Sequence, residues 1–201
     1  MDSAATAKGL TLHSRSGTAY RFDAGALCLE LMTTGGPGPY RHFEVLHAPA
    51  DLTVFAERSR LAPTPELAVT GQDVTDLRRV RDALFGLVFA HLDGTPLPTE
   101  ELALLNEAAA RPSLAPAVAA DGTRHWAAGA TGAQLVATVA RDAVDLLTGP
   151  SAHRIRTCSA DNCQLVYVDT SRPGNRRWCS MEHCGNRHKV RALRARHTEE
   201  G

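Results

Sequence analysis

Four cysteines near the end of the sequence have a spacing that suits a metal ion. Cys158 and Cys163 form one pair, and Cys179 and Cys184 form a second pair. Four residues separate the members of each pair, and fifteen residues separate the pairs. Two such pairs can each hold one side of a tetrahedral Zn²⁺ at about 2.3 Å if the intervening segment folds back. The spacing therefore predicts a zinc site made by all four side chains.

We expect this zinc to be structural. Four thiolates fill the tetrahedral shell and leave no position for water or substrate, so the site would not be catalytic. Zinc binding would then contribute about 10 kcal/mol or more to folding, as it does in zinc-finger peptides. We expect Cys184 to begin the last helix, where free backbone N–H groups and the helix dipole lower the pKa of a thiol.

The charge is uneven along the chain. The sequence has 22 basic and 22 acidic residues, and this balance alone predicts neither nucleic-acid nor membrane binding. Residues 1–149 hold twelve Lys or Arg and seventeen Asp or Glu, whereas residues 150–197 hold ten and three, a net charge of +7. The basic excess therefore coincides with the cysteines.

Cations surround the predicted zinc site in the sequence, and on the last helix three arginines recur at i, i+4 and i+7. Together they could form a basic surface that binds a phosphate backbone, with an affinity that falls as salt rises. The candidate nucleic-acid-binding residues are Arg172, Arg176, Arg177, Arg187, Lys189, Arg191 and Arg194. The alternative is that these cations offset the negative charge of a zinc–thiolate centre or dock on an acidic protein surface.

Two histidines raise an enzymatic alternative, a metal-dependent nuclease. His183 lies between two predicted zinc ligands, and His188 lies among cations without an obvious carboxylate partner. We therefore expect both to be surface residues and the protein not to be an enzyme.

The sequence predicts a cytoplasmic protein with no membrane partner. Residues 1–17 lack the apolar run of a signal peptide, and the longest apolar-rich stretch, Leu84 to Leu92, is too short to span a bilayer. In a reducing compartment, cysteines at paired spacing bind metal more often than they form disulfides. The fifth cysteine, Cys28, lies in an apolar helical pattern that predicts a buried, inert thiol.

Hydrophobic periodicity in residues 1–149 predicts helices with small β-hairpins. Two short strands are expected within residues 10–22. The expected helices span residues 25–34, 50–61, 72–91, 99–111 and 131–148. Thr70 with Asp73 and Thr131 with Gln134 predict capping boxes. Arg78, Arg79 and Arg81 are expected on a solvated helix face. Asp121-Gly122 predicts a hairpin with a type I′ turn, in which both central residues have positive φ.

Gly149-Pro150 ends the last of these helices and predicts a domain boundary. Beyond it we expect a knuckle at residues 158–163, a strand at 165–169, a turn at 173–175 and a terminal helix at 185–197. Knuckle, hairpin and helix are the components of a treble-clef finger. The predicted fold class is α+β, with a mostly helical domain over residues 1–149 and a treble-clef-like, four-cysteine zinc finger over residues 150–201.

The sequence RRWCSM at residues 176–181, followed by CGNR at residues 184–187 and by Lys189, resembles the CGNR zinc finger, which is named for that tetrapeptide. The resemblance covers about His153 to Arg196 and implies that the four cysteines are zinc ligands. Asp169, Ser171 and Arg172 also fit the hairpin pattern of that finger.

Members of this family usually carry an amino-terminal ABATE domain, and GALCLELMTT at residues 25–34 resembles its first helix. That helix usually has Asp and Asn-Thr, whereas Glu30 and Thr33 replace the Asp and the Asn here. The family is taken to contain bacterial stress-linked transcription regulators. The resemblance therefore implies a zinc-containing protein with DNA as its partner.

We therefore expect a transcription regulator whose finger contacts DNA. By analogy, its larger domain would sense a small-molecule effector or form a homodimer. The main alternative is that the finger is a rigid, zinc-stabilised module that docks on a protein partner without binding DNA.

Overall fold

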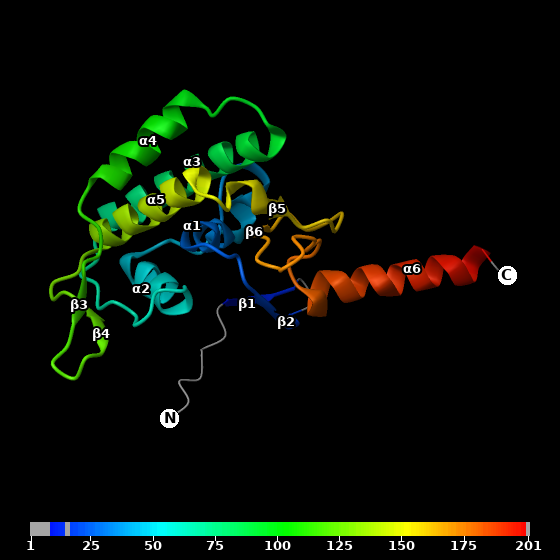
Figure 1. Ribbon diagram of the computed structural model, residues 1–201, viewed down its shortest axis with the longest axis horizontal. Coiled ribbons are helices and arrows are strands. Elements are labelled where there is room, and N and C mark those ends of the chain that lie inside the picture. The colour runs from blue at the N-terminus through cyan, green and yellow to red at the C-terminus, as the bar shows by residue number, and fades with distance from the viewer. Residues whose placement is uncertain (1–8, 15–16, 200–201) are drawn as a thin grey trace. The chain divides into compact units, whose positions relative to one another are not determined.

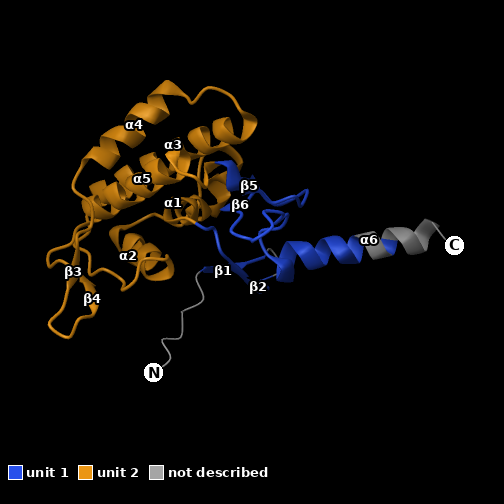
Figure 2. Cartoon of the chain, in the orientation of Figure 1, with its two compact units in different colours: residues 1–25, 153–201 blue, residues 26–152 orange. Residues whose placement is uncertain are grey.

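The computed structural model describes residues 9–14 and 17–199, with the side chains at 192, 193 and 195–199 left out. The chain forms two compact units (Figure 2). One unit combines residues 1–25 with 153–201, and the other is formed by residues 26–152. The amino-terminal hairpin therefore belongs to the unit that holds the four zinc-site cysteines. The sequence predicts domains at residues 1–149 and 150–201, and these bounds stay a prediction. They do not place residues 1–25 with the cysteines, as the compact units do.

Helices make up most of the larger unit (Figure 1). They are α1 Leu27–Leu31, η1 Met32–Thr34, η2 Gly38–Phe43, α2 Pro49–Arg58, α3 Gly71–Asp93, α4 Thr99–Ala110 and α5 Gly132–Thr148, of which η1 and η2 are 3₁₀-helices. Helices α3, α4 and α5 pack on one another, α1 contacts α3 and α5, and α2 contacts α3. Leucines at the predicted inward positions, among them Leu77, Leu84 and Leu135, are fully buried. The predicted α+β fold class, mostly helical with small hairpins, is confirmed.

The two predicted capping boxes begin α3 and α5. The hydroxyl of Thr70 accepts a hydrogen bond from the backbone N–H of Asp73 at 3.3 Å, and the Asp73 carboxylate accepts one from the backbone N–H of Thr70 at 2.8 Å. Thr131 and Gln134 form the same reciprocal pair at 3.3 and 3.0 Å. Each box provides partners for backbone N–H groups that have no acceptor inside the helix.

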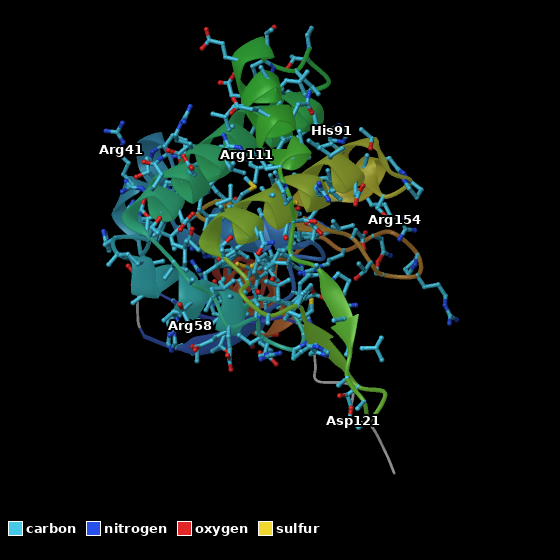
Figure 3. The ribbon with its side chains drawn as sticks, turned by 90° about the vertical axis from the view of Figure 1, so that its left-hand side faces the viewer. Arg41, Arg58, His91, Arg111, Asp121 and Arg154 are labelled. Carbon is cyan, nitrogen blue, oxygen red and sulfur yellow. The ribbon has the colours of Figure 1, made fainter. Side chains whose placement is uncertain are left out.

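The hairpin of the larger unit has strands β3 Pro116–Val118 and β4 Arg124–Trp126, and Asp121 lies at its tip (Figure 3). The predicted type I′ turn is wrong, because positive φ among the described residues is confined to glycines. Gly122 has φ 82°, and its N–H donates to the Ala119 carbonyl at 2.9 Å. Asp121 accepts hydrogen bonds from the N–H and hydroxyl of Thr123 at 2.9 and 2.6 Å. This longer loop therefore needs only one residue with positive φ.

The smaller unit contains short strands and one long helix. Strands β1 Leu10–His13 and β2 Ala19–Phe22 pair with Leu10 opposite Phe22, and β5 Ile155–Thr157 pairs with β6 Val166–Val168. The 3₁₀-helix η3 spans Ala152–Arg154, the π-helical turn η4 spans Met181–Gly185, and α6 spans Asn186–Glu199. Among the described residues, no helix is both long and apolar enough to cross a membrane.

Arg81 on α3 is buried, with 1% of its surface exposed, so its predicted place on a solvated face is wrong. Its guanidinium donates to both carboxylate oxygens of Glu44 at 2.8 Å and also bonds Asp82. Burial opposes the ionisation of Glu44, but hydrogen bonds from Arg81 and the backbone of Leu46 outweigh it and keep the Glu44 pKa below its usual value. The ion pair lets the unit bury a charged group.

We expect Glu44→Ala to destabilise the larger unit by about 3 kcal/mol at pH 7, because Arg81 would lose its main anionic partner. The Glu44 pKa is lowered in the folded state. The stabilisation is therefore fully present above the unfolded pKa of about 4.3 and is lost as the pH falls through the lower, folded value. Thermal unfolding of wild type and variant should differ at pH 7 and converge towards pH 3. An equal difference at both pH values would contradict this, and Glu57→Ala, at an exposed position, is the control.

Candidate metal centre and basic helix

The four predicted zinc ligands come together in the structure. The sulfur atoms of Cys158, Cys163, Cys179 and Cys184 all lie within 4.8 Å of one another. Cys163 Sγ and Cys179 Sγ are 3.7 Å apart. Zn–S bonds of about 2.3 Å place the sulfurs of a tetrahedral site about 3.8 Å apart. The donor set and its spacing therefore fit one Zn²⁺ with four thiolate ligands.

The four thiols influence one another's ionisation. Hydrogen bonds from Cys163 and Cys179 lower the pKa of Cys158, and the hydrogen bond with Cys158 raises the pKa of Cys163. The hydrogen bond with Cys158 also raises the pKa of Cys179. The four sulfur atoms surround the position that a metal would occupy. A divalent cation can replace the thiol protons and neutralise the thiolates, so zinc binding releases protons.

Backbone hydrogen bonds shape the knuckle that holds the first cysteine pair. The N–H of Cys158 donates to the Leu165 carbonyl at 3.0 Å, and the N–H of Cys163 donates to the Ala160 carbonyl at 2.9 Å. The N–H of Cys179 donates to Cys158 Sγ at 3.3 Å, which favours a charged sulfur. This hydrogen bond joins the knuckle to the second cysteine pair without a metal.

The helical segment at Cys184 begins earlier than predicted. A π-helical turn starts at Met181 and leads directly into α6, so Cys184 lies inside the segment and not at its first residue. Burial raises the pKa of Cys184, which opposes the lowering that is expected at a helix terminus. A Cβ atom on the neighbouring Gly185 would lie 2.8 Å from Met181 Sδ and 3.3 Å from Trp178 Cδ1. Glycine at this position lets the Trp178 ring approach the start of the helix.

Arg176 is engaged inside the fold. Its guanidinium donates to the carbonyls of Trp178, Cys179 and Asp23 at 3.0, 2.5 and 3.0 Å. It also lies over the Tyr167 ring at 4.0 Å. These contacts connect the segment that carries the second cysteine pair to the amino-terminal hairpin. We therefore assign Arg176 to the stability of the unit and leave it out of the proposed DNA contacts.

Asp169 orders the loop between β6 and the second cysteine pair. One carboxylate oxygen accepts from the N–H and hydroxyl of Ser171 at 2.9 and 2.5 Å, and the other accepts from the N–H of Arg176 at 2.8 Å. Burial opposes ionisation, but these hydrogen bonds hold the Asp169 pKa below its usual value. They give a physical reason for Asp and Ser at these two positions of the hairpin pattern.

The other six predicted nucleic-acid-binding residues are at least partly exposed to solvent. Arg172, Arg177, Lys189, Arg191 and Arg194 are exposed, and Arg187 is half-buried. Arg187 donates to Asn162 Oδ1 at 3.0 Å, and Arg191 lies 3.5 Å from Asp161 Oδ2. Arg187 and Arg191 also line a groove of about 350 Å³ between the knuckle and α6. No spacing in the sequence indicates that knuckle residues contact these arginines.

The two histidines considered for catalysis make ring contacts. His183 stacks on Tyr20, with ring centroids 4.4 Å apart, and the His188 ring lies 4.7 Å from that of Trp178. Burial and the Arg187 cation lower the pKa of His183. Within the described part of the chain, the four cysteines are the only group of three or more potential ligands that lie close enough for a metal. The structure therefore does not place either histidine in a second metal cluster.

We expect zinc chelation to expose the amides of β5, β6 and η4 to hydrogen exchange, because the metal contributes about 10 kcal/mol or more to such folds. The amides of β1 and β2 should follow, since Asp23 and Ala24 accept hydrogen bonds from Arg176 and Val168. The amides of α3 and α5 should stay protected, because residues 26–152 contribute no ligand to the cysteine site.

Hydrogen exchange followed by mass spectrometry gives this measurement. Cys179→Ser should reproduce the effect of the chelator, whereas Cys28→Ala should leave the zinc content unchanged. Loss of protection in α3 equal to that in β6, or no change in β6, would contradict the assignment.

Comparison with known families agrees with the fold and the metal centre. Residues 25–150 match the ABATE family model, described as "putative stress-induced transcription regulator". Residues 154–197 match the CGNR zinc finger model. No curated protein matches the chain. The hairpin at residues 9–24 lies outside both matches, although it belongs to the same compact unit as the finger.

Proposed function

Because the chain belongs to the ABATE family and carries a CGNR zinc finger, we propose that it regulates transcription by binding DNA through α6 and the loops beside it. Zinc would be structural in this role. It would fix the base of α6 through Cys179 and Cys184, and the arginines would make the contacts with DNA. No step of this function needs a reaction at the metal.

The observation that carries the proposal is the set of exposed cations on and beside α6. Arg187, Arg191 and Arg194 recur at i, i+4 and i+7, and Arg191 and Arg194 are exposed. Arg172 and Arg177 on the preceding loop are exposed as well. Residues 150–197 carry a net charge of +7. A basic helix beside basic loops suits phosphate contacts on both sides of a DNA groove.

The size of α6 also suits this role. Its 14 residues give a length of about 21 Å at 1.5 Å per residue. The major groove of DNA is about 12 Å wide and admits an α-helix. Arginine on such a helix can bind a guanine edge with two hydrogen bonds or can pair with phosphate. We propose phosphate contacts for Arg191, Arg194 and Lys189.

For residues 26–152, sensing of a small molecule and dimerisation stay predictions. Glu30 and Thr33, which replace the Asp and the Asn usual in the family, both form hydrogen bonds within the unit. Glu30 is fully buried and accepts hydrogen bonds from the side chain and backbone N–H of Arg60 at 3.0 and 2.8 Å. The hydroxyl of Thr33 donates to the Glu30 carbonyl at 2.7 Å. Location in the cytoplasm also stays a prediction.

We expect the zinc-loaded protein to bind duplex DNA at low salt, with an affinity that falls steeply as salt rises. Arg191→Gln combined with Arg194→Gln should weaken binding and lower the slope of log K against log salt by about 2, because each phosphate contact contributes about 0.9. Fluorescence anisotropy of a labelled pool of genomic fragments at several salt concentrations measures both quantities.

Arg41→Gln combined with Arg58→Gln is the matched control. It removes the same charge from exposed positions of the larger unit, where Figure 3 labels both residues. This control should keep the wild-type slope. No DNA binding by zinc-loaded wild type at low salt would overturn the proposal and favour the finger as a protein-docking module.

A further inference from the structure

The amino-terminal hairpin, which lies outside both family matches, is attached to the zinc finger by hydrogen bonds. Phe22 at the end of β2 is fully buried. The Ala24 carbonyl accepts a hydrogen bond from the N–H of Val168 at 2.8 Å, and the Asp23 carbonyl accepts one from Arg176 at 3.0 Å. These two hydrogen bonds fix the end of β2 beside the finger. They do not involve the ring of Tyr20.

Tyr20 reaches the helical segment that carries the basic residues. Its ring stacks on His183 with centroids 4.4 Å apart and an interplanar angle of 10°. His183 Nε2 in turn lies 3.3 Å from Arg187 NH1. On its other side, Arg187 NH2 donates to Asn162 Oδ1 at 3.0 Å. The guanidinium is therefore held between the imidazole of His183 and the amide of Asn162.

We propose that Tyr20 is a positioning residue for DNA binding, which orients Arg187 by fixing the His183 ring. This inference rests on the proposed DNA binding and extends it to a segment outside both family matches. An arginine side chain loses rotamer freedom when it binds a ligand. Arg187 loses less rotamer freedom on binding, because its guanidinium is already oriented in the free protein.

The geometry leaves Arg187 able to bind. A guanidinium has five N–H donors, and Asn162 and His183 each engage one nitrogen of the fork. The donors that remain can contact a phosphate or a base edge. Arg187 also lines grooves on two sides of α6, together with Arg191 in both cases. The oriented guanidinium of Arg187 therefore lies among the exposed cations of the same helix.

The experiment compares Tyr20→Ala, Tyr20→Phe and Arg187→Gln in the full-length, zinc-loaded protein. Tyr20→Ala should weaken duplex DNA binding roughly 3- to 10-fold, the range that an aromatic stacking contact supports. Tyr20→Phe keeps the ring and should bind like wild type. In the Arg187→Gln background, Tyr20→Ala should have no further effect, because the residue acts through Arg187.

Thr11→Ala on the neighbouring strand is the control for a general effect on the hairpin, since Thr11 is exposed. All variants should keep full zinc content. Wild-type binding by Tyr20→Ala, or equal weakening by it with and without Arg187, would overturn the positioning role.

A spectroscopic measurement separates this inference from the proposed function. The Nη–Hη resonance of Arg187 at the nitrogen facing His183 should be protected from solvent exchange in wild type and Tyr20→Phe, and exchange-broadened in Tyr20→Ala. An unchanged resonance in Tyr20→Ala would overturn the inference, whether or not the protein binds DNA. Failure of the wild type to bind DNA, with this resonance behaving as expected, would overturn the DNA proposal and leave Tyr20 positioning Arg187.

Discussion

The structure of the finger depends on the close packing of four ionisable sulfur atoms. Sulfurs within 4.8 Å of one another cannot all be charged at low cost unless a cation lies between them. Zn²⁺ satisfies this constraint and joins the knuckle at residues 158–163 to the start of the last helical segment. The metal thereby fixes the base of α6 relative to the knuckle. The fixed geometry places Asn162 and Asp161 beside Arg187 and Arg191.

Four arginines of this unit differ in their surroundings and therefore in the roles that we assign to them. Arg176 is held by three backbone carbonyls and the Tyr167 ring, so it stabilises the fold. Arg187 is oriented by Asn162 and His183 and keeps donors for a ligand. Arg191 and Arg194 are exposed on α6, and Arg191 lies 3.5 Å from Asp161 Oδ2. The basic segment is therefore not a uniform surface, and in the proposed function only part of its charge contacts DNA.

Features that depend on local spacing can be predicted from the sequence. The cysteine pairs, the helical periodicity and the capping boxes at Thr70 and Thr131 all involve short, regular intervals, and each is present in the structure. Contacts between distant residues leave no such pattern. Arg81 is buried because Glu44, 37 positions away, supplies its counter-charge, and the Tyr20–His183 stack joins opposite ends of the chain. Spacing within one segment carries no signal for either contact.

The central claim is that one closed, four-sulfur zinc site organises the finger. X-ray absorption at the zinc edge of the purified protein tests it directly. We expect one zinc per chain with four sulfur ligands at about 2.3 Å and no nitrogen or oxygen ligand. A nitrogen or oxygen ligand at about 2.0 to 2.2 Å in place of a sulfur, or a protein that folds fully without zinc, would contradict it.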